Sequence, residues 1–209
     1  MIRLALPKGR NLASAVEALA TAGLALPRLD GDDRRLRRAF PELGLETLLL
    51  KDRDLPLYVE RGVADCGVVG RDVLDEVDAD LLVPLELARG RCRMSLIGRA
   101  GARPPAAGEQ RRLATKYPRA AARLLEGRPW SAEVIELAGS IELAPELGLA
   151  DLALDIVQTG ATLAAHHLVE LEVVREIAPC FVVQRASWQV RRAELLGLIE
   201  RLEGAGVAA

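Results

Sequence analysis

The chain has 209 residues, enough for one large domain or for two smaller lobes with a core each. Half of the residues are hydrophobic, 28% are charged and the formal net charge is −2, a composition typical of globular rather than disordered proteins. The small net charge and an aromatic content of only 3% argue against a general nucleic-acid binder and against a membrane-surface protein.

The cysteines and the N-terminus indicate a cytoplasmic protein. Cys66, Cys92 and Cys180 are odd in number and widely spaced, so the sequence indicates neither a disulfide framework nor a zinc site. We expect each thiol to be a small buried hydrophobe. The first residues lack the features of a signal peptide, and no apolar run reaches the length of a membrane span.

The first half of the chain alternates short apolar runs with amphipathic stretches. Strands are predicted at residues 2–6, 36–40, 45–50, 65–70 and 81–87. Helices are predicted from residue 10 or 11 to residue 22, from 54 to 62, and for one turn from residue 71. Asp54 is expected to cap its helix, with Pro56 in the first turn.

The second half continues the alternation. Strands are predicted at residues 91–98, 112–115, 133–137, 152–157, 172–178 and 181–184. Helices are predicted at residues 117–125, 144–149, 162–168 and 189–202. This order of elements predicts an α/β protein with a mainly parallel sheet, and short strands on both sides of residues 88–92 are compatible with two lobes.

Residues 158–162, Gln-Thr-Gly-Ala-Thr, join a predicted strand to a predicted helix, and we call them the phosphate loop. A turn at Gly160 allows several backbone N–H groups to converge on one point. Thr159 and Thr162 add hydroxyl donors, and the N-terminus of the next helix adds partial positive charge. The segment therefore predicts an anion site. The alternative is an ordinary strand-to-helix turn with Thr162 as its N-cap.

Two acidic residues precede the loop, and both fall on one face of the predicted strand. Asp151 and Asp155 are four residues apart, which places them on the same side of an extended chain. A carboxylate beside a phosphate site needs another task, and accepting hydrogen bonds from the ribose 2′- and 3′-hydroxyls is such a task.

With this segment and several others in view, the chain resembles the ATP phosphoribosyltransferase family of histidine biosynthesis. The motifs that carry the resemblance are Ala5-Leu-Pro-Lys-Gly-Arg10, Asp65-Cys-Gly-Val-Val-Gly70-Arg-Asp72, Gly90-Arg-Cys92, Ala114-Thr-Lys-Tyr-Pro118, Gly139-Ser-Ile-Glu142 and Asp151-Leu-Ala-Leu-Asp155-Ile-Val-Gln-Thr-Gly-Ala-Thr-Leu163. They span nearly the whole chain, and its length is similar to the family's short form.

The resemblance implies a fold, a reaction and partners. The fold is two α/β lobes of the periplasmic-binding-protein type II kind, with lobe I at residues 1–88 and 181–209 and lobe II at residues 89–180. The reaction is attack of adenine N1 of ATP on C1 of 5-phosphoribosyl diphosphate, with Mg²⁺ carried by the substrate. The partner is a regulatory subunit resembling histidyl-tRNA synthetase, in a hetero-octamer. No nucleophile or general base is assigned, so covalent catalysis is not predicted.

The resemblance also implies two sets of binding residues. The set for 5-phosphoribosyl diphosphate is Asp151, Asp155, Gln158, Thr159, Gly160, Ala161 and Thr162. The set for ATP and diphosphate is Lys8, Gly9, Arg10, Lys51, Asp65, Gly67, Gly70, Lys116 and Glu142.

Most members of the second set have a structural alternative. Lys8, Arg10 and Lys116 can be ordinary solvated charges, and Glu142 can be a helix cap. Asp65, Gly67 and Gly70 can mark a tight strand exit. Lys51 departs from the family pattern, which usually has arginine there; lysine lacks the guanidinium fork, and Arg53 is a possible substitute.

Three other functions stay open at this point. The chain can be a non-enzymatic binder of small anions with the same two lobes, a phosphoribosyltransferase for another base, or an interaction subunit. The absence of a secretion signal argues against the small-anion binder, and the intact phosphate loop argues against the interaction subunit. Only the motifs around the loop argue against a phosphoribosyltransferase for another base.

Overall fold

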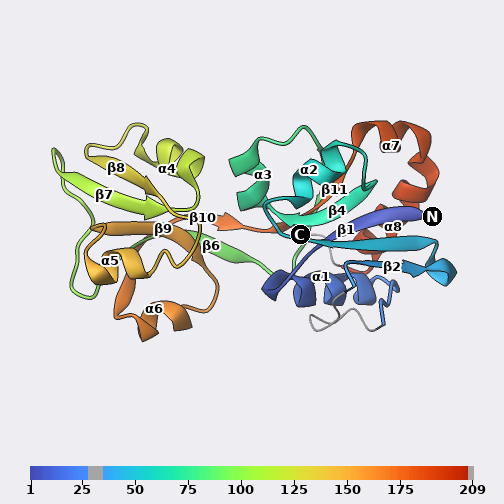
Figure 1. Cartoon of the computed structure of the whole chain (residues 1–209), viewed down its shortest axis with the longest axis horizontal. Coiled ribbons are helices and arrows are strands. Elements are labelled where there is room, and N and C mark those ends of the chain that lie inside the picture. Colours follow the sequence, from blue (N-terminus) through green and yellow to red (C-terminus); the bar gives the residue numbers. More distant parts are fainter. Residues whose placement is uncertain (28–34, 207–209) are drawn as a thin grey trace. The chain divides into compact units, whose positions relative to one another are not determined.

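The structure is a computed structural model that describes residues 1–27 and 35–206. The chain divides into two compact units, and we describe each by itself. Unit 1 consists of Met1–Arg91 and Ala178–Ala209, and unit 2 of Cys92–Ile177. Each unit is a mixed β-sheet with helices on both faces (Figure 1), which confirms the α/β class. Over the described ranges no helix is both long and apolar enough to cross a membrane.

In unit 1 the order of strands places the first strand near the middle of the sheet. Across the sheet the described strands are β2 (Arg37–Phe40), β3 (Leu45–Leu50), β1 (Ile2–Pro7), β4 (Cys66–Gly70), β11 (Pro179–Val183) and β5 (Leu82–Glu86). The helical segments are α1 (Arg10–Thr21), η1 (Pro41–Leu43), α2 (Leu55–Glu60), α3 (Arg71–Val77), α7 (Arg185–Val190) and α8 (Arg192–Gly204).

The core of unit 1 lies on both faces of this sheet because side chains alternate along each strand. Leu4 and Leu6 of β1 pack in a cluster with α1 and α8, whereas Ala5 belongs to a cluster with α2 and α3. β1 runs parallel to β3 and β4, so their carboxyl ends lie at the same edge of the sheet. The loops that follow these strands are therefore neighbours.

Unit 2 is a second sheet built from strands that are distant in sequence. Across the sheet the described strands are β10 (Leu168–Ile177), β6 (Cys92–Arg99), β9 (Leu152–Val157), β7 (Gln110–Thr115) and β8 (Ser131–Glu136). Its helices are α4 (Pro118–Leu125), α5 (Leu143–Leu147) and α6 (Ala161–Ala165). As Figure 1 shows, α4 covers one face and α5 and α6 cover the other.

Successive side chains of β9 point to opposite faces of the sheet in unit 2. Leu152 and Leu154 belong to the cluster under α4, and Ala153 and Val157 belong to the cluster under α5 and α6. Asp155 is two residues from Ala153 and two from Val157. It therefore shares their face of the sheet, which α5 and α6 cover.

The prediction of a mainly parallel sheet was wrong. β1 with its neighbours β3 and β4, and β7 with its neighbours β8 and β9, are the parallel pairs; the remaining described pairs are antiparallel. The reason is that β6 runs against both of its neighbours in unit 2, and that β11 runs against β4 and β5 and β2 runs against β3 in unit 1. Alternation of strand and helix along a sequence carries no signal for such reversals.

Two element boundaries also differ from the prediction. The last predicted helix, 189–202, is two helices, α7 and α8, with a break at Arg191. β10 starts at Leu168, before the predicted start at residue 172, because it follows α6 directly and pairs along β6 with two irregularities. Asp54 precedes α2 as predicted, but its side chain makes no capping hydrogen bond.

The boundaries between the units differ by a few residues from those predicted for the lobes. The prediction placed lobe I at residues 1–88 and 181–209 and lobe II at residues 89–180. Pro179 and Cys180 pair with β4, and Leu87 N donates to Pro179 O at 2.7 Å. These backbone bonds assign the start of β11 to the sheet of unit 1.

Gly67 illustrates how closely β1, β4 and α2 pack. A Cβ at this position would lie 3.0 Å from Ala5 O and 3.0 Å from Leu55 Cδ2, both in the interior. We expect Gly67→Ala to lower the free energy of unfolding by roughly 1–3 kcal/mol through overpacking. Urea denaturation measures this. The control is Gly197→Ala in α8, where nothing lies within 4 Å and stability should rise by up to about 1 kcal/mol. Equal effects of the two substitutions would contradict the packing argument.

Candidate functional site

The phosphate loop lies at the carboxyl end of β9, between that strand and α6. Gly160 has φ 80° and ψ −2°, in the left-handed region, and it is the N-cap of α6. Leu163 is buried and anchors the helix, whereas Thr159 and Thr162 are exposed. The turn thus presents its backbone and both hydroxyls to solvent, as an anion site requires.

The alternative role for Thr162 as the N-cap does not hold, because Gly160 occupies that position and Thr162 is already inside α6. Thr159 has a local role: its Oγ1 accepts a hydrogen bond from Ala161 N at 3.4 Å. The helix itself has only five residues, so its macrodipole is small. Any anion binding here depends on the first-turn N–H groups, which have no partner within the helix.

A buried threonine joins the loop after β7 to β9. Thr115 Oγ1 donates to Leu154 O at 2.7 Å and accepts from Tyr117 N at 2.9 Å, and the side chain is fully buried. These bonds fix the backbone around Lys116. The Lys116 ammonium then lies 3.4 Å from Asp155 Oδ1 and 5.0 Å from the ring of Tyr117.

Asp155 is a carboxylate held in a mostly buried position. Its Oδ1 accepts a hydrogen bond from Ile156 N at 2.8 Å as well as facing Lys116. Burial raises the pKa of Asp155, Lys116 opposes that rise, and the charge of Glu142 adds to it. The structure therefore brings together Asp155, Lys116 and Glu142, which are dispersed in the sequence, beside the phosphate loop.

Glu142 lies at the start of α5 and is half-buried. It occupies the N-cap position, but its side chain makes no capping hydrogen bond. The capping alternative therefore lacks its main interaction, whereas the electrostatic effect on Asp155 is present.

Asp151, which was predicted with Asp155 as a binding residue, lies apart from this cluster. It precedes β9 at the end of the strand away from the loop. Its carboxylate accepts from Arg112 N at 2.8 Å and from Arg112 Nη2 at 3.0 Å, and these bonds lower the pKa of Asp151. Asp151 therefore ties β9 to β7.

A second group of predicted residues meets at the carboxyl edge of the unit 1 sheet. Lys8 follows β1 and Lys51 follows β3, and Lys8 N donates to Leu50 O at 2.7 Å. Asn11 Nδ2 donates to Asp52 Oδ2 at 2.7 Å, which links the same two loops. Both lysines are exposed. Two positive charges thus lie in neighbouring loops at the edge where α/β proteins bind ligands.

The other residues predicted in unit 1 behave differently. Gly9 has φ 75° and ψ −141° and is the N-cap of α1, a backbone conformation that favours glycine. The side chain of Arg10 lies outside the described part of the structure. A Cβ on Gly67 would meet β1 and α2 rather than solvent, so its close approach is a packing contact. Gly70 ends β4 and leaves room for the Asp72 carboxylate.

Asp65, predicted to bind ATP or diphosphate, makes structural contacts in this chain. It precedes β4 and lies at the amino edge of the sheet, away from Lys8. Its buried carboxylate accepts from Arg3 N and from Ser187 Oγ, each at 2.8 Å, with Arg191 Nη1 at 3.9 Å. It therefore connects β1 and β4 to α7.

Three residues that shape these loops were not among the predicted site residues: Thr115, Asn11 and Arg93. Thr115 and Asn11 act through contacts with residues about 40 positions away, which no local pattern reveals. Arg93 Nη1 donates to Gln158 O at 3.3 Å and so contacts the phosphate loop directly.

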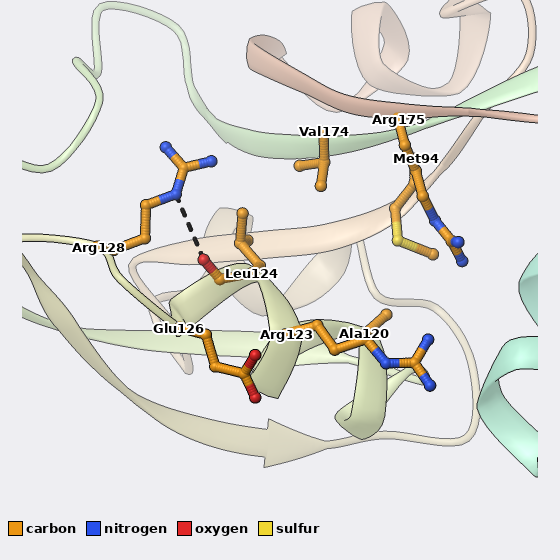
Figure 2. Close-up of a pocket in the computed structure, with 8 residues that line it drawn as sticks. All are labelled: Met94, Ala120, Arg123, Leu124, Glu126, Arg128, Val174 and Arg175. Carbon is orange, nitrogen blue, oxygen red and sulfur yellow. Dashed lines mark hydrogen bonds between the residues drawn. The ribbon is translucent and has the colours of Figure 1, made fainter.

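A separate pocket of about 290 Å³ lies on the α4 face of unit 2. Figure 2 shows Leu124 and Arg128 at one side of it, joined by a bond from Arg128 Nε to Leu124 O, with Val174 and Met94 opposite. Its lining includes none of the predicted binding residues.

The cysteines are unreactive by their surroundings. Cys66 and Cys180 are fully buried and Cys92 is partly exposed. Burial raises the pKa of the Cys180 thiol to about 11 and that of Cys66 still further. Both buried thiols stay protonated at neutral pH, as expected for structural cysteines.

Comparison of the whole fold with solved structures gives the class first. The chain is similar to the periplasmic aliphatic sulphonate binding protein SsuA from Escherichia coli, with a TM-score of 0.65 at 14% identity, covering 98% of this chain and 72% of that one. At this identity the similarity shows the fold alone. The chain is therefore a two-domain α/β protein of the periplasmic-binding-protein kind, which confirms the predicted fold class.

The sequence comparisons then give the family. The family described as "HisG: ATP phosphoribosyltransferase" matches residues 51–204. An ATP phosphoribosyltransferase from Thermus thermophilus is 48% identical over 96% of this chain and 95% of its own length, and one from Deinococcus radiodurans is 46% identical over 96% and 89%. The chain belongs to the ATP phosphoribosyltransferase family, and its enzymatic class is pentosyltransferase.

A solved complex supports the same assignment. It is described as "ATP phosphoribosyl transferase (HisG:HisZ) complex from Thermotoga maritima". One of its chains matches with a TM-score of 0.80 and 33% identity, over 98% of both chains.

Asp155 in β9 and Asp151 just before this strand should affect the pH dependence of stability with opposite sign. The pKa of Asp155 is raised above its ordinary 3.8, so its charged form destabilises the fold at neutral pH and this penalty vanishes as pH falls through the raised pKa. The pKa of Asp151 is lowered, so its stabilisation is present above 3.8 and lost as pH falls through the lower value.

We therefore expect Asp155→Asn to leave the free energy of unfolding at pH 7 equal or higher, and Asp151→Asn to lower it. The difference for Asp155→Asn should shrink at pH 4, because pH then approaches or passes below the raised pKa of Asp155, whereas the difference for Asp151→Asn should persist at pH 4 and shrink only as pH falls below 3.8. Urea denaturation at pH 7, at pH 4 and at a pH below 3.8 measures them, with each variant as the other's control. A larger loss at pH 7 for Asp155→Asn than for Asp151→Asn would contradict the assigned environments.

Proposed function

We propose that the phosphate loop binds the 5-phosphate of 5-phosphoribosyl diphosphate in the reaction of this family. That reaction joins N1 of the adenine of ATP to C1 of the phosphoribosyl group and releases diphosphate, in the first step of histidine biosynthesis. The carrying observation is the left-handed turn at Gly160, the N-cap of α6, which lies between the exposed Thr159 and Thr162. Neutral donors of this kind hold a phosphate without a lysine in the turn.

The same proposal assigns Asp155 to the ribose. Its carboxylate has one oxygen engaged by Ile156 N and Lys116, and it lies at the end of the strand that enters the loop. A carboxylate in this position can accept hydrogen bonds from the ribose 2′- and 3′-hydroxyls. Because burial raises its pKa, new hydrogen-bond donors from a substrate would stabilise its charged form.

The positive side chains are proposed to meet the polyphosphate groups. Lys116 lies beside Asp155 in unit 2, and Lys8 and Lys51 lie in neighbouring loops of unit 1. ATP and the departing diphosphate carry several negative charges, so fixed cations lower the energy of the transition state as charge develops on the leaving group. Glu142, Gly9, Arg10 and Gly70 complete the proposed set, whereas Asp65, Gly67 and Asp151 are removed from it.

Enzymes of this family generally use a divalent metal ion. We propose that the ion is Mg²⁺ and that it arrives bound to the diphosphate of the substrate. Mg²⁺ keeps phosphate and water oxygens as ligands in many phosphoryl substrates, so the protein supplies at most one or two carboxylates.

The partner is proposed from the solved complex. Since the Thermotoga maritima protein is described in complex with HisZ, we propose that this chain also binds a HisZ-type regulatory subunit, in a hetero-octamer. A cytoplasmic location belongs to the same proposal, because ATP is consumed there.

We expect Thr159→Ala, Thr162→Ala and Asp155→Ala each to lower kcat/KM for 5-phosphoribosyl diphosphate at least about tenfold, or roughly 1.4 kcal/mol. Each removes a hydroxyl or carboxylate from the proposed substrate contacts. Absorbance of phosphoribosyl-ATP measures turnover, with and without a HisZ-type subunit. Thr21→Ala is the matched control, because within the described residues that exposed hydroxyl bonds inside α1, to Glu17 O. Unchanged kinetics in all three variants would disprove the site.

A further inference from the structure

Arg93 and Glu170 form an ion pair that reaches the phosphate loop from the two strands at the edge of the sheet. Arg93 in β6 donates Nε to Glu170 Oε2 at 2.7 Å and Nη2 to Glu170 Oε1. Its remaining nitrogen, Nη1, donates to Gln158 O at 3.3 Å, the first residue of the loop. One guanidinium thus joins β10 to the loop that follows β9.

The network lies on the same face of the sheet as Asp155. Ser95 is directly opposite Asp155 in the β6–β9 register, and Arg93 is opposite Val157. The fully buried Ser95 donates its hydroxyl to Glu170 Oε2 at 2.7 Å. Two donors therefore fix the Glu170 carboxylate, and the carboxylate in turn fixes the plane of the guanidinium.

Holding Gln158 O also fixes the next N–H group. The peptide unit between Gln158 and Thr159 is planar and trans, so its C=O and N–H point in opposite directions. While Arg93 holds the carbonyl on its own side, Thr159 N–H points away from the guanidinium. This orientation is set before any ligand arrives, which is preorganisation of a donor in the loop.

The charge of Arg93 is already matched by Glu170. The pKa of Glu170 is lowered, first by the hydrogen bond from Arg93 and also by that from Ser95, so the pair stays ionised at neutral pH. The side chains are 30% and 23% exposed, so solvent screens the pair only in part. The guanidinium donates Nε and Nη2 to Glu170 and Nη1 to Gln158 O. Its effect on a ligand is therefore exerted through the position of the loop backbone.

We propose that Arg93 and Glu170 are positioning residues that set the backbone of the phosphate loop for the 5-phosphate of 5-phosphoribosyl diphosphate. This inference rests on the proposed function of the loop. It assigns a task to a pair that lies outside the binding residues and that no sequence motif singled out.

Glu170→Gln separates positioning from direct contact of Arg93 with the phosphate. If Arg93 bound the phosphate, removing the opposing carboxylate would free its charge and tighten binding. If the pair positions the loop, the neutral amide holds the guanidinium less firmly and binding weakens. We expect Kd for 5-phosphoribosyl diphosphate, measured by calorimetry on the full chain, to rise about five- to tenfold, while KM for ATP changes less than twofold.

Arg93→Lys is the second variant, because it keeps the positive charge and loses the planar fork. It should weaken binding by a similar factor, and the double variant should be no weaker than either single one, as expected for residues that act as a unit. Glu172→Gln is the matched control: it lies on the same strand and pairs with Arg128, at 3.2 Å from Arg128 Nη1 to Glu172 Oε2, without contact to the loop.

Thr162→Ala distinguishes failure of this inference from failure of the site. If Glu170→Gln binds as tightly as wild type or Glu172→Gln while Thr162→Ala is weakened, the loop is the site and the positioning role is wrong. If Thr162→Ala is also unchanged, the site is wrong and the inference falls with it. A melting temperature that drops equally for both glutamate variants, with a Kd change only in Glu170→Gln, would support positioning over a general loss of stability.

Discussion

The site of unit 2 depends on one buried hydroxyl. Thr115, the last residue of β7, bonds to the backbone of Leu154 inside β9, so the residues that follow these two, Lys116 and Asp155, face one another. The bridge holds the Lys116 ammonium beside Asp155, where it offsets part of the cost of burying that carboxylate. The phosphate loop begins three residues after Asp155, so the same bridge fixes where the loop starts.

Local features of the site could be predicted because their signals are local. Strand, glycine turn and helix around Gly160 follow from residue types within ten positions, and the structure has them. The adjacency of Lys116, Glu142 and Asp155 depends on strand pairing between distant segments, which periodicity does not encode. The family resemblance implied these residues as a set. The structure shows that Lys116 lies beside Asp155 and that the charge of Glu142 affects the pKa of Asp155.

Two of the predicted binding aspartates, Asp65 and Asp151, make structural contacts for one common reason. Asp65 and Asp151 each stand immediately before a strand, whereas Asp155 stands near the end of one. In parallel strands the residue before the strand lies at the amino edge of the sheet, and ligands bind at the carboxyl edge. Both residues accordingly bond to backbone and arginine groups that hold strands together. Position relative to the strand direction therefore separates structural acids from candidate ligand-binding acids in this chain.

The place of β11 has a consequence for synthesis. This strand, made of residues 179–183, lies between β4 and β5, which are complete about 100 residues earlier. The segment Cys92–Ile177 is therefore fully translated while the sheet of unit 1 still lacks an inner strand. During translation the second unit has all its strands first. Until the C-terminal segment emerges, the nascent first unit leaves one edge of β4 unpaired and β5 without the neighbouring strand β11. These two strands are where a ribosome-bound chain of this protein would be most prone to wrong pairing.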